Sequence, residues 1–276
     1  MPDRLNRPAK PLIIIASERT GTNYLCALLT HHPQIAAYYE IFSNVAVMMT
    51  DEEVKALCKA QDWPFTDRGD ARLVACFKSC PHQIIERIGS GLSAEKKIFS
   101  FKVFQGHLPP VVLARMIQEY SAIALTRRII DSYISFIKAT ETKAWLKLDT
   151  TQVKPTLDIN DFVTWYRDRH TYYTLCASQY LKTHQKGIEV LRYEDFIRGS
   201  NLENLTFSCE KISAATGIDI GLFNTEFKLE YWKQDKNQSV SDKVTNWPEF
   251  EGQLQERGLL EAAFDSFLKP TSTKLE

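Results

Sequence analysis

The 276-residue sequence lacks the features that mark several large classes of protein. No apolar run approaches the ~18 residues that a membrane-spanning helix needs. Lys and Arg together number 34, as do Asp and Glu, so no excess of one charge points to nucleic acid or an anionic membrane. There is also no internal repeat, low-complexity tract or linker. We therefore expect one domain over residues 1–276, with no membrane span and no nucleic-acid partner.

The six cysteines form no C-x-x-C pair. Cys76, Cys80 and His82 are close enough to be considered as metal ligands, but a fourth partner is missing. Reduced, mostly buried thiols are therefore expected, and no metal. The first eleven residues contain charges and three prolines rather than the apolar core of a signal peptide, which predicts a cytoplasmic location.

What is present is an alternation of short apolar strands and helices. Strand-like runs occur at 12–16, 98–104, 121–126 and 188–193, and segments of helical periodicity include 24–29, 111–118, 128–138 and 162–181. This alternation predicts an α/β fold with a central parallel sheet and helices on both faces. Ligands of such sheets bind beyond the carboxyl ends of the strands.

Two stretches, 43–97 and 141–160, look like insertions that shape a substrate site. The first contains a helix opened by the capping box Thr50-Asp51-Glu52-Glu53, and the second reads as a loop.

The most informative motif is the loop Ser17-Glu18-Arg19-Thr20-Gly21-Thr22-Asn23, which joins the first strand to a helix. A strand, a tight glycine turn and a helix aim backbone N–H groups and the positive end of a helix dipole at one point, which makes an anion site. The loop has the shape of a P-loop but lacks its Gly-Lys-Ser/Thr ending, so no hydroxyl stands in the usual place to hold Mg²⁺. With Arg19 early in the loop, it suits a sulfate better than a metal-bound triphosphate.

A second motif begins at Arg127, where the third strand-like run ends. Ser135 follows eight residues later on the next helix, and two helical turns can bring it back beside the strand end. Arg127 and the Ser135 hydroxyl could then hold one phosphate together.

Together, the Ser17–Asn23 loop and Arg127-x3-Asp131-x3-Ser135 resemble the donor-binding pair of the sulfotransferases, which use 3′-phosphoadenosine 5′-phosphosulfate (PAPS). Residues 16–25 are most similar to bacterial carbohydrate sulfotransferases that act on Nod factors, trehalose or lipopolysaccharide. The likeness extends through residues 39–42, 101–104 and 193–196, and covers about 180 residues from Leu12 to Phe196. It implies a P-loop-like three-layer fold.

The resemblance also implies partners and site residues. The donor would be PAPS and the product adenosine 3′,5′-bisphosphate, with no metal, and the acceptor a glycan or small molecule with a free hydroxyl. Arg127 and Ser135 would hold the 3′-phosphate, and Tyr193 would lie near the adenine. A later polar segment with Lys236, Ser241 and Lys243 would close over the donor. The residues implied for the 5′-phosphosulfate are Arg19, Thr20, Gly21, Thr22 and Asn23.

Transfer of a sulfuryl group is expected to rely on positioning and charge stabilisation. Arg19 is assigned to the sulfuryl and leaving-group oxygens, where cytosolic relatives have Lys, and Lys102 to a second positive charge. Two residues are alternative candidates for the general base. Glu40, flanked by aromatic residues, is expected to have a raised pKa, and trehalose-type enzymes place a catalytic Glu at the matching position. His107 resembles the His of a His-Leu-Pro turn in cytosolic enzymes, although five positions separate it from Lys102, where those enzymes show fewer.

Proteins of two other functional classes are expected to have the same sheet and loop. An ATP-dependent small-molecule kinase would require Mg²⁺, and the absent Lys-Ser/Thr pair argues against it. A non-catalytic nucleotide-binding protein would bind the donor without turnover. For the acceptor, Trp63, Trp145 and Trp165 could offer flat faces to sugar rings. Most aromatics at helical spacing are core, and Trp165 fits an apolar helix face, so Trp145, which ends the helix after Ser135, is favoured.

Overall fold

The fold is built on a five-stranded sheet in which all neighbouring strands are parallel, in the order β2-β3-β1-β4-β5. The computed structural model describes residues 8–269 except 147, 222 and 230–233. The strands are β1 (Lys10–Ile15), β2 (Ile35–Ala37), β3 (Ile98–Val103), β4 (Ser121–Thr126) and β5 (Glu189–Arg192). The predicted parallel sheet is confirmed. Its one unexpected member, β2, has only three residues, too few to show a periodic pattern.

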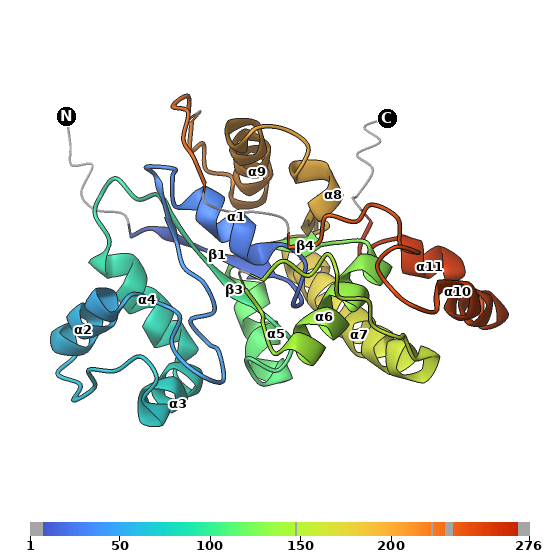
Figure 1. Cartoon of the computed structure of the whole chain (residues 1–276). Helices are drawn as coiled ribbons and strands as arrows, with labels where there is room; N and C mark the ends of the chain where they lie inside the picture. The colour runs from blue at the N-terminus through green and yellow to red at the C-terminus, as the bar shows by residue number, and fades with distance from the viewer. Residues whose placement is uncertain (1–7, 147, 222, 230–233, 270–276) are drawn as a thin grey trace.

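Helices cover both faces of this sheet (Figure 1). Successive residues of β1 point to opposite faces, so that Ile13 and Ile15 join one core cluster and Leu12 and Ile14 the other, all fully buried. On the side of Leu12 lie α1 (Thr22–Leu29) and α9 (Asn201–Thr216). On the other side lie α4 (Pro81–Gly91), α5 (Pro110–Glu119), α6 (Ile129–Thr142) and α7 (Ile159–His184). The predicted α/β arrangement of three layers is therefore confirmed.

The remaining helices lie at the edges of these layers. The stretch 43–97 contains α2 (Asp51–Ala60) and α3 (Ala71–Ser79) before α4, and α2 begins with the expected capping box of Thr50 and Glu53. The helices α8 (Tyr193–Phe196), α10 (Trp247–Glu256) and α11 (Leu260–Phe264) follow later in the chain. The loop expected over 141–160 is shorter in the structure, because α6 extends to Thr142 and α7 starts at Ile159. No helix among the described residues is long and apolar enough to cross a membrane.

Candidate active site

The loop after β1 bends sharply into α1. Both Arg19 (φ 67°) and Gly21 (φ 91°) have left-handed backbone conformations. Gly21 is the N-cap residue of α1 and carries no side chain, and the first helical turn contains no acidic residue. The first N–H groups of a helix lack partners within the helix, and here the positive end of the dipole is not neutralised by a carboxylate of that turn. The loop therefore has the local geometry of an anion site.

Tyr173 on α7 fixes the start of this loop. Its hydroxyl accepts a hydrogen bond from the Ser17 N–H (2.9 Å) and donates to the carbonyl of Leu125 in β4 (2.8 Å). The Thr20 hydroxyl donates to the carbonyl of Ser17 (2.8 Å). Because Tyr173 and Thr20 are both buried, these bonds are shielded from water. Tyr173 lies in the segment 162–181, for which the sequence predicted a helix, but a pattern of apolar residues gives no sign of a hydroxyl that reaches the loop.

Gly21 leaves no room for a larger residue. A Cβ atom built on it would lie 2.4 Å from Cδ2 of Tyr193. We expect Gly21→Ala to destabilise the fold by about 2 kcal/mol or more, because it adds a left-handed alanine and forces Tyr193 to move. Urea unfolding measures the change. The matched control is Gly252→Ala in α10, where a Cβ would meet nothing within 4 Å and the free energy of unfolding should rise by roughly 0.5–1 kcal/mol. Equal stability of the two variants would contradict the expectation.

Arg127, directly after β4, lies against the same loop. Its Nη1 donates to the carbonyl of Arg19 (2.9 Å), and its guanidinium lies 4.6 Å from the centre of the Tyr193 ring. The Nε atom of Arg127 is buried and has no hydrogen-bond partner among the described residues. A buried donor without a partner is costly unless a ligand or water completes it, so this atom marks a place for an acceptor.

Asp131, on the first turn of α6, forms ion pairs with two further basic side chains. It pairs with Nζ of Lys243 (2.6 Å) and with Nε of Arg128. Burial raises the pKa of Asp131, but the nearby Arg127 guanidinium and the two hydrogen bonds outweigh burial, and the pKa lies below its usual value. The carboxylate is therefore charged at neutral pH, and it holds Lys243 beside Arg127.

These elements enclose a cavity of about 90 Å³, which we call the donor cavity. Gly21 and Arg127 line it together, so the two anion-binding motifs of the sequence lie on one cavity. Of the residues predicted to hold the donor, Thr20 is buried under the loop and the rest line the cavity. The full lining is Arg19, Gly21, Thr22, Asn23, Arg127, Asp131, Ile134, Ser135, Tyr193, Gln234, Asp235 and Lys243.

The side chain of Arg19 lies across this cavity. Its Nε donates to the Ser135 hydroxyl (2.9 Å), Nη1 to the carbonyl of Trp145 (2.6 Å) and Nη2 to Oε1 of Gln234. The cavity volume of about 90 Å³ is smaller than the roughly 300–1,000 Å³ of typical ligand pockets. Ser135, predicted as a phosphate ligand, is bonded to Arg19 here, so a phosphate that bound Ser135 would compete with this guanidinium.

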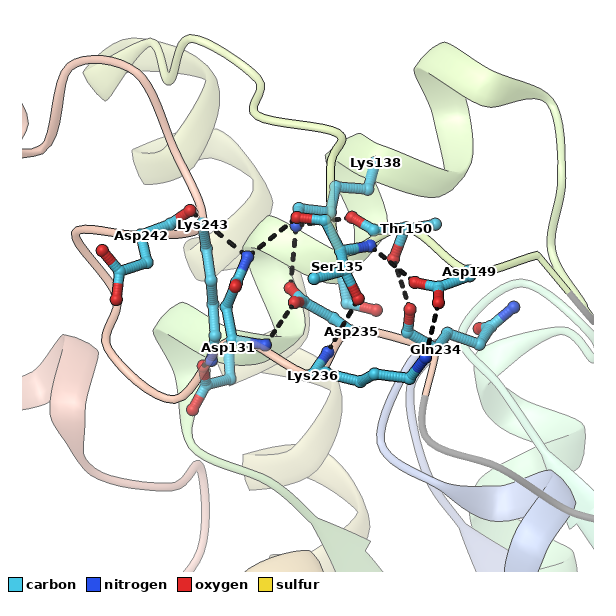
Figure 2. A network of polar contacts seen from close by, with 12 residues as sticks. Asp131, Ser135, Lys138, Asp149, Thr150, Gln234, Asp235, Lys236, Asp242 and Lys243 are labelled. Atoms are coloured by element: carbon cyan, nitrogen blue, oxygen red, sulfur yellow. Dashed lines mark hydrogen bonds and ion pairs between the residues drawn. The ribbon is translucent and has the colours of Figure 1, made fainter.

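Gln234, Asp235 and Lys243 line the donor cavity. Figure 2 shows the polar contacts around them. Asp235 pairs with the buried Nζ of Lys138 on α6 (2.8 Å), which also donates to the carbonyl of Thr150 (3.1 Å). The carbonyl of Gln234 accepts from the Thr150 N–H (2.7 Å). The sequence pointed to this segment through Lys243, which lines the cavity, but not to Gln234 or Asp235.

The two other residues predicted in this segment have different surroundings. Lys236 is exposed and pairs with Asp149 (2.7 Å), and the Ser241 hydroxyl contacts that of Ser239 (2.6 Å). Neither Lys236 nor Ser241 is among the described residues that line the donor cavity.

A second and larger cavity, of about 870 Å³, adjoins the donor cavity. We call it the acceptor-side cavity. Glu40, Lys102 and Trp145 line it. The two cavities share four lining residues, Arg19, Thr22, Asn23 and Gln234. The start of α1 thus separates one compartment from the other.

Lys102, the fifth residue of β3, is fully buried and lines the acceptor-side cavity. Its ammonium group lies 3.0 Å from Oε1 of Glu40 and 3.3 Å from the Thr22 hydroxyl, and it donates to Oδ1 of Asn23. A buried ammonium is tolerated only with such partners. The arrangement places a positive charge and a carboxylate together beside the first turn of α1.

His107 lies elsewhere. It lines a separate surface hollow with Lys78 and Gly106 and is not among the described residues of either cavity above. Its Nδ1 accepts the Phe104 N–H (3.2 Å), so the neutral ring carries its proton on Nε2. Burial, with the positive charges of Lys78 and Lys102, lowers the pKa of His107 to about 4. Proton uptake at Nδ1 would break the bond to the backbone.

This lowered pKa predicts an acid-sensitive contribution to stability. Between pH 6.5 and 4 the unfolded chain binds a proton at His107 that the folded chain does not, so stability falls as the pH falls. From pH 7 to pH 5 the loss due to His107 should be about 2 kcal/mol. Urea unfolding of the wild type and of His107→Gln at both pH values measures it. Parallel losses in the two proteins would contradict the prediction.

The tryptophans named as acceptor platforms differ in position. Trp145 lines the acceptor-side cavity and is 44% exposed. Trp165 is buried in the core, and Trp63 packs against that core below the guanidinium of Arg87. Among the described residues, no group of three or more His, Cys, Asp or Glu side chains is arranged to hold a metal ion.

Comparison with known proteins identifies the family. The sulfotransferase domain family matches residues 9–247, and the chain belongs to this family. Nodulation protein H of Rhizobium tropici is 28% identical over 167 residues, which are 57% of this chain and 59% of that protein. Nodulation protein H of Rhizobium meliloti is 25% identical over 150 residues, 54% of this chain and 55% of that protein. The matches thus span little more than half the length of these relatives.

A solved structure, the sulfotransferase domain from the curacin biosynthetic pathway, is also similar. It has 11% sequence identity and a TM-score of 0.38, and the match covers 87% of this chain and 84% of that one.

Proposed function

We propose that this protein transfers the sulfuryl group of PAPS to a hydroxyl of a carbohydrate or glycolipid acceptor. Membership of the sulfotransferase domain family supports sulfuryl transfer. The single observation that carries the proposal is that the donor cavity and the acceptor-side cavity meet at Arg19, Thr22 and Asn23. A group held at the start of α1 would face both compartments, as transfer between two bound molecules requires.

The residues of the donor cavity fit an adenosine bisphosphate. Its lining carries the cations Arg19, Arg127 and Lys243, and the buried Nε of Arg127 lacks a protein partner among the described residues. We assign the 3′-phosphate to Arg127, Lys243 and Ser135, and the 5′-phosphosulfate to the loop from Arg19 to Asn23. The Tyr193 ring would lie beside the adenine. When bound, PAPS supplies a sulfuryl group on a phosphate leaving group.

Catalysis is assigned to residues beside the start of α1. Arg19 and Lys102 would stabilise negative charge on the sulfuryl and leaving-group oxygens. Glu40 would accept the proton of the attacking hydroxyl, while the new O–S bond forms and the bond from sulfur to the leaving phosphate oxygen breaks. We favour Glu40 over His107 as the base because Glu40 lines the acceptor-side cavity and His107 lines another hollow.

The test is incubation with PAPS labelled in the sulfuryl group and a panel of sugars, glycolipids and phenols. We expect label on a carbohydrate or glycolipid acceptor without added metal. Parallel reactions with ATP and Mg²⁺ test for a kinase. Phosphoryl transfer without sulfuryl transfer would overturn the proposal, and tight binding of adenosine 3′,5′-bisphosphate without transfer to any acceptor would favour a non-catalytic binding protein.

A further inference from the structure

Glu18 lines the acceptor-side cavity and is not among the described residues that line the donor cavity. We propose that its carboxylate binds two neighbouring hydroxyls of the acceptor, and that this contact decides which other hydroxyl reaches Glu40. The inference rests on the proposed function, because it assumes that a molecule with several hydroxyls occupies the cavity. It assigns a specificity-determining residue to a loop whose other residues are assigned to the donor.

Only one oxygen of the Glu18 carboxylate is engaged by the described part of the protein. The Oε2 atom lies 3.2 Å from Nη2 of Arg169, whereas Oε1 has no hydrogen-bond partner among the described residues. The side chain lines the cavity and is 30% exposed. An ionised carboxylate offers about four lone-pair positions, so it can accept two hydroxyl donors in addition to the arginine.

Arg169, on α7, holds this carboxylate in place. Its guanidinium lies 4.7 Å from the centre of the Trp165 ring and 5.2 Å from that of the Phe136 ring, and its side chain is only 13% exposed. Contact with two aromatic rings restricts the guanidinium, and the guanidinium in turn orients Glu18. Because Arg169 balances the charge of Glu18, the pair favours neutral hydroxyl donors over a second cation. Hydroxyls that donate to a carboxylate form strong, charge-assisted hydrogen bonds.

Trp145 lines the same cavity and supplies a flat apolar face. The centre of its ring lies 6.0 Å from that of Phe136, which also contacts Arg169. A sugar ring has apolar C–H faces and a rim of hydroxyls, so it can pack on an indole while the rim meets a carboxylate. Trp145 and Glu18 together provide both kinds of contact.

Glu18 also stands on a fixed backbone at the boundary of the two cavities. The N–H of Ser17, the residue before it, is bonded to the buried hydroxyl of Tyr173 (2.9 Å). Arg19, the residue after it, lines both cavities. An acceptor held at Glu18 by two hydroxyls can present only some of its other hydroxyls to Glu40. The contact therefore controls the position that receives the sulfuryl group.

Binding of simple sugars tests the inference without turnover. Calorimetric titration in the presence of adenosine 3′,5′-bisphosphate would compare the methyl glycosides of glucose, galactose and mannose. Glu18→Gln should weaken binding of the tightest of them about tenfold to 100-fold, because the amide has no charge and one acceptor oxygen. Monodeoxy analogues of that glycoside should identify two adjacent hydroxyls. Removal of either one should weaken binding to the wild type about tenfold and have little effect in Glu18→Gln.

Glu189 provides the matched control. Its carboxylate lies 3.2 Å from Nζ of Lys211 and its side chain is 29% exposed, values close to those of Glu18. Glu189 lies on β5, however, and is not among the described residues of either cavity. Glu189→Gln should therefore bind the glycosides as the wild type does. Equal effects of the two variants, equal losses from the deoxy analogues in wild type and Glu18→Gln, or no binding of any glycoside would overturn the inference.

The product of transfer gives a second readout, which separates this inference from the proposed function. With a glycoside that accepts label, Glu18→Gln should raise KM about tenfold or more, change kcat much less, and spread the sulfate over several positions of the sugar. A fall in kcat at unchanged KM, with the product unchanged, would overturn the role in specificity. Sugar binding that depends on Glu18 without any transfer would overturn the proposed function alone. Transfer with binding and product independent of Glu18 would overturn this inference alone.

Discussion

Replacing Arg127 with Ala is expected to weaken the binding of adenosine 3′,5′-bisphosphate at least 10²-fold. Hydrogen bonds to charged groups contribute about 1.5–3 kcal/mol each, and a forked guanidinium can make two to one phosphate. Arg127 is positioned for this because it lines the donor cavity with a buried Nε that has no partner among the described residues. Calorimetric titration without metal measures the affinity.

Two further variants test whether the loss of affinity is specific to the Arg127 guanidinium. Arg127→Lys keeps the positive charge but loses the fork, so its affinity should lie between those of the wild type and Arg127→Ala. Arg115→Ala is the control, because Arg115 is exposed on α5, pairs with Glu119 one turn away and is not among the described residues that line the donor cavity. Unchanged affinity in a folded Arg127→Ala protein would remove the 3′-phosphate assignment. Melting curves check the fold, since Arg127 also holds the carbonyl of Arg19.

Glu40→Gln is expected to lower kcat by roughly 10²–10⁴, with the affinity for adenosine 3′,5′-bisphosphate unchanged. The amide cannot take the proton of the acceptor hydroxyl but has nearly the same shape. His107→Gln, by contrast, should keep kcat close to the wild-type value, because His107 lines a different hollow. Single-turnover transfer to the best acceptor measures both variants. A large loss in His107→Gln together with an active Glu40→Gln would exchange the two roles.

One side effect of Glu40→Gln needs a control. Glu40 is the carboxylate partner of the fully buried Lys102, and an uncompensated buried charge can cost about 3–5 kcal/mol. Glu40→Asp keeps the negative charge but shortens the side chain. If proton transfer is the role of Glu40, the Asp variant should retain stability and part of the activity. If ion pairing alone matters, Asp should restore kcat fully.

The parts of the fold that the sequence predicted are those with strong local patterns. The runs at 98–104 and 121–126 became β3 and β4 with bounds within one residue, because buried parallel strands read as continuous apolar runs. The strand β2 and the helix α3 are among the elements that were not predicted. Three residues carry no period, and α3 buries Leu73, Val74 and Phe77 in the core. For these elements the tertiary contacts, not the local pattern, decide the structure.

The candidate site was likewise predicted only in part. Gly21 and Arg127 could be named because each belongs to a short motif at the end of a strand. Gln234 and Asp235 could not, because they reach the cavity through contacts with Thr150 and Lys138, which lie more than 80 positions away in the chain. Such long-range contacts leave no periodic or motif signal. The roles assigned to individual catalytic and donor-binding residues remain predictions for the variants above to test.

The side chain of Arg19 links the donor cavity to the acceptor-side cavity. One guanidinium bonds the Ser135 hydroxyl, which lines the donor cavity, and the carbonyl of Trp145, which lines the acceptor-side cavity. A ligand that drew this guanidinium away from Ser135 would also disturb its bond to Trp145, so binding in one cavity would act on the lining of the other. By thermodynamic linkage, a ligand in one cavity should then change the affinity of the other cavity for its ligand, and the reverse effect should have the same size.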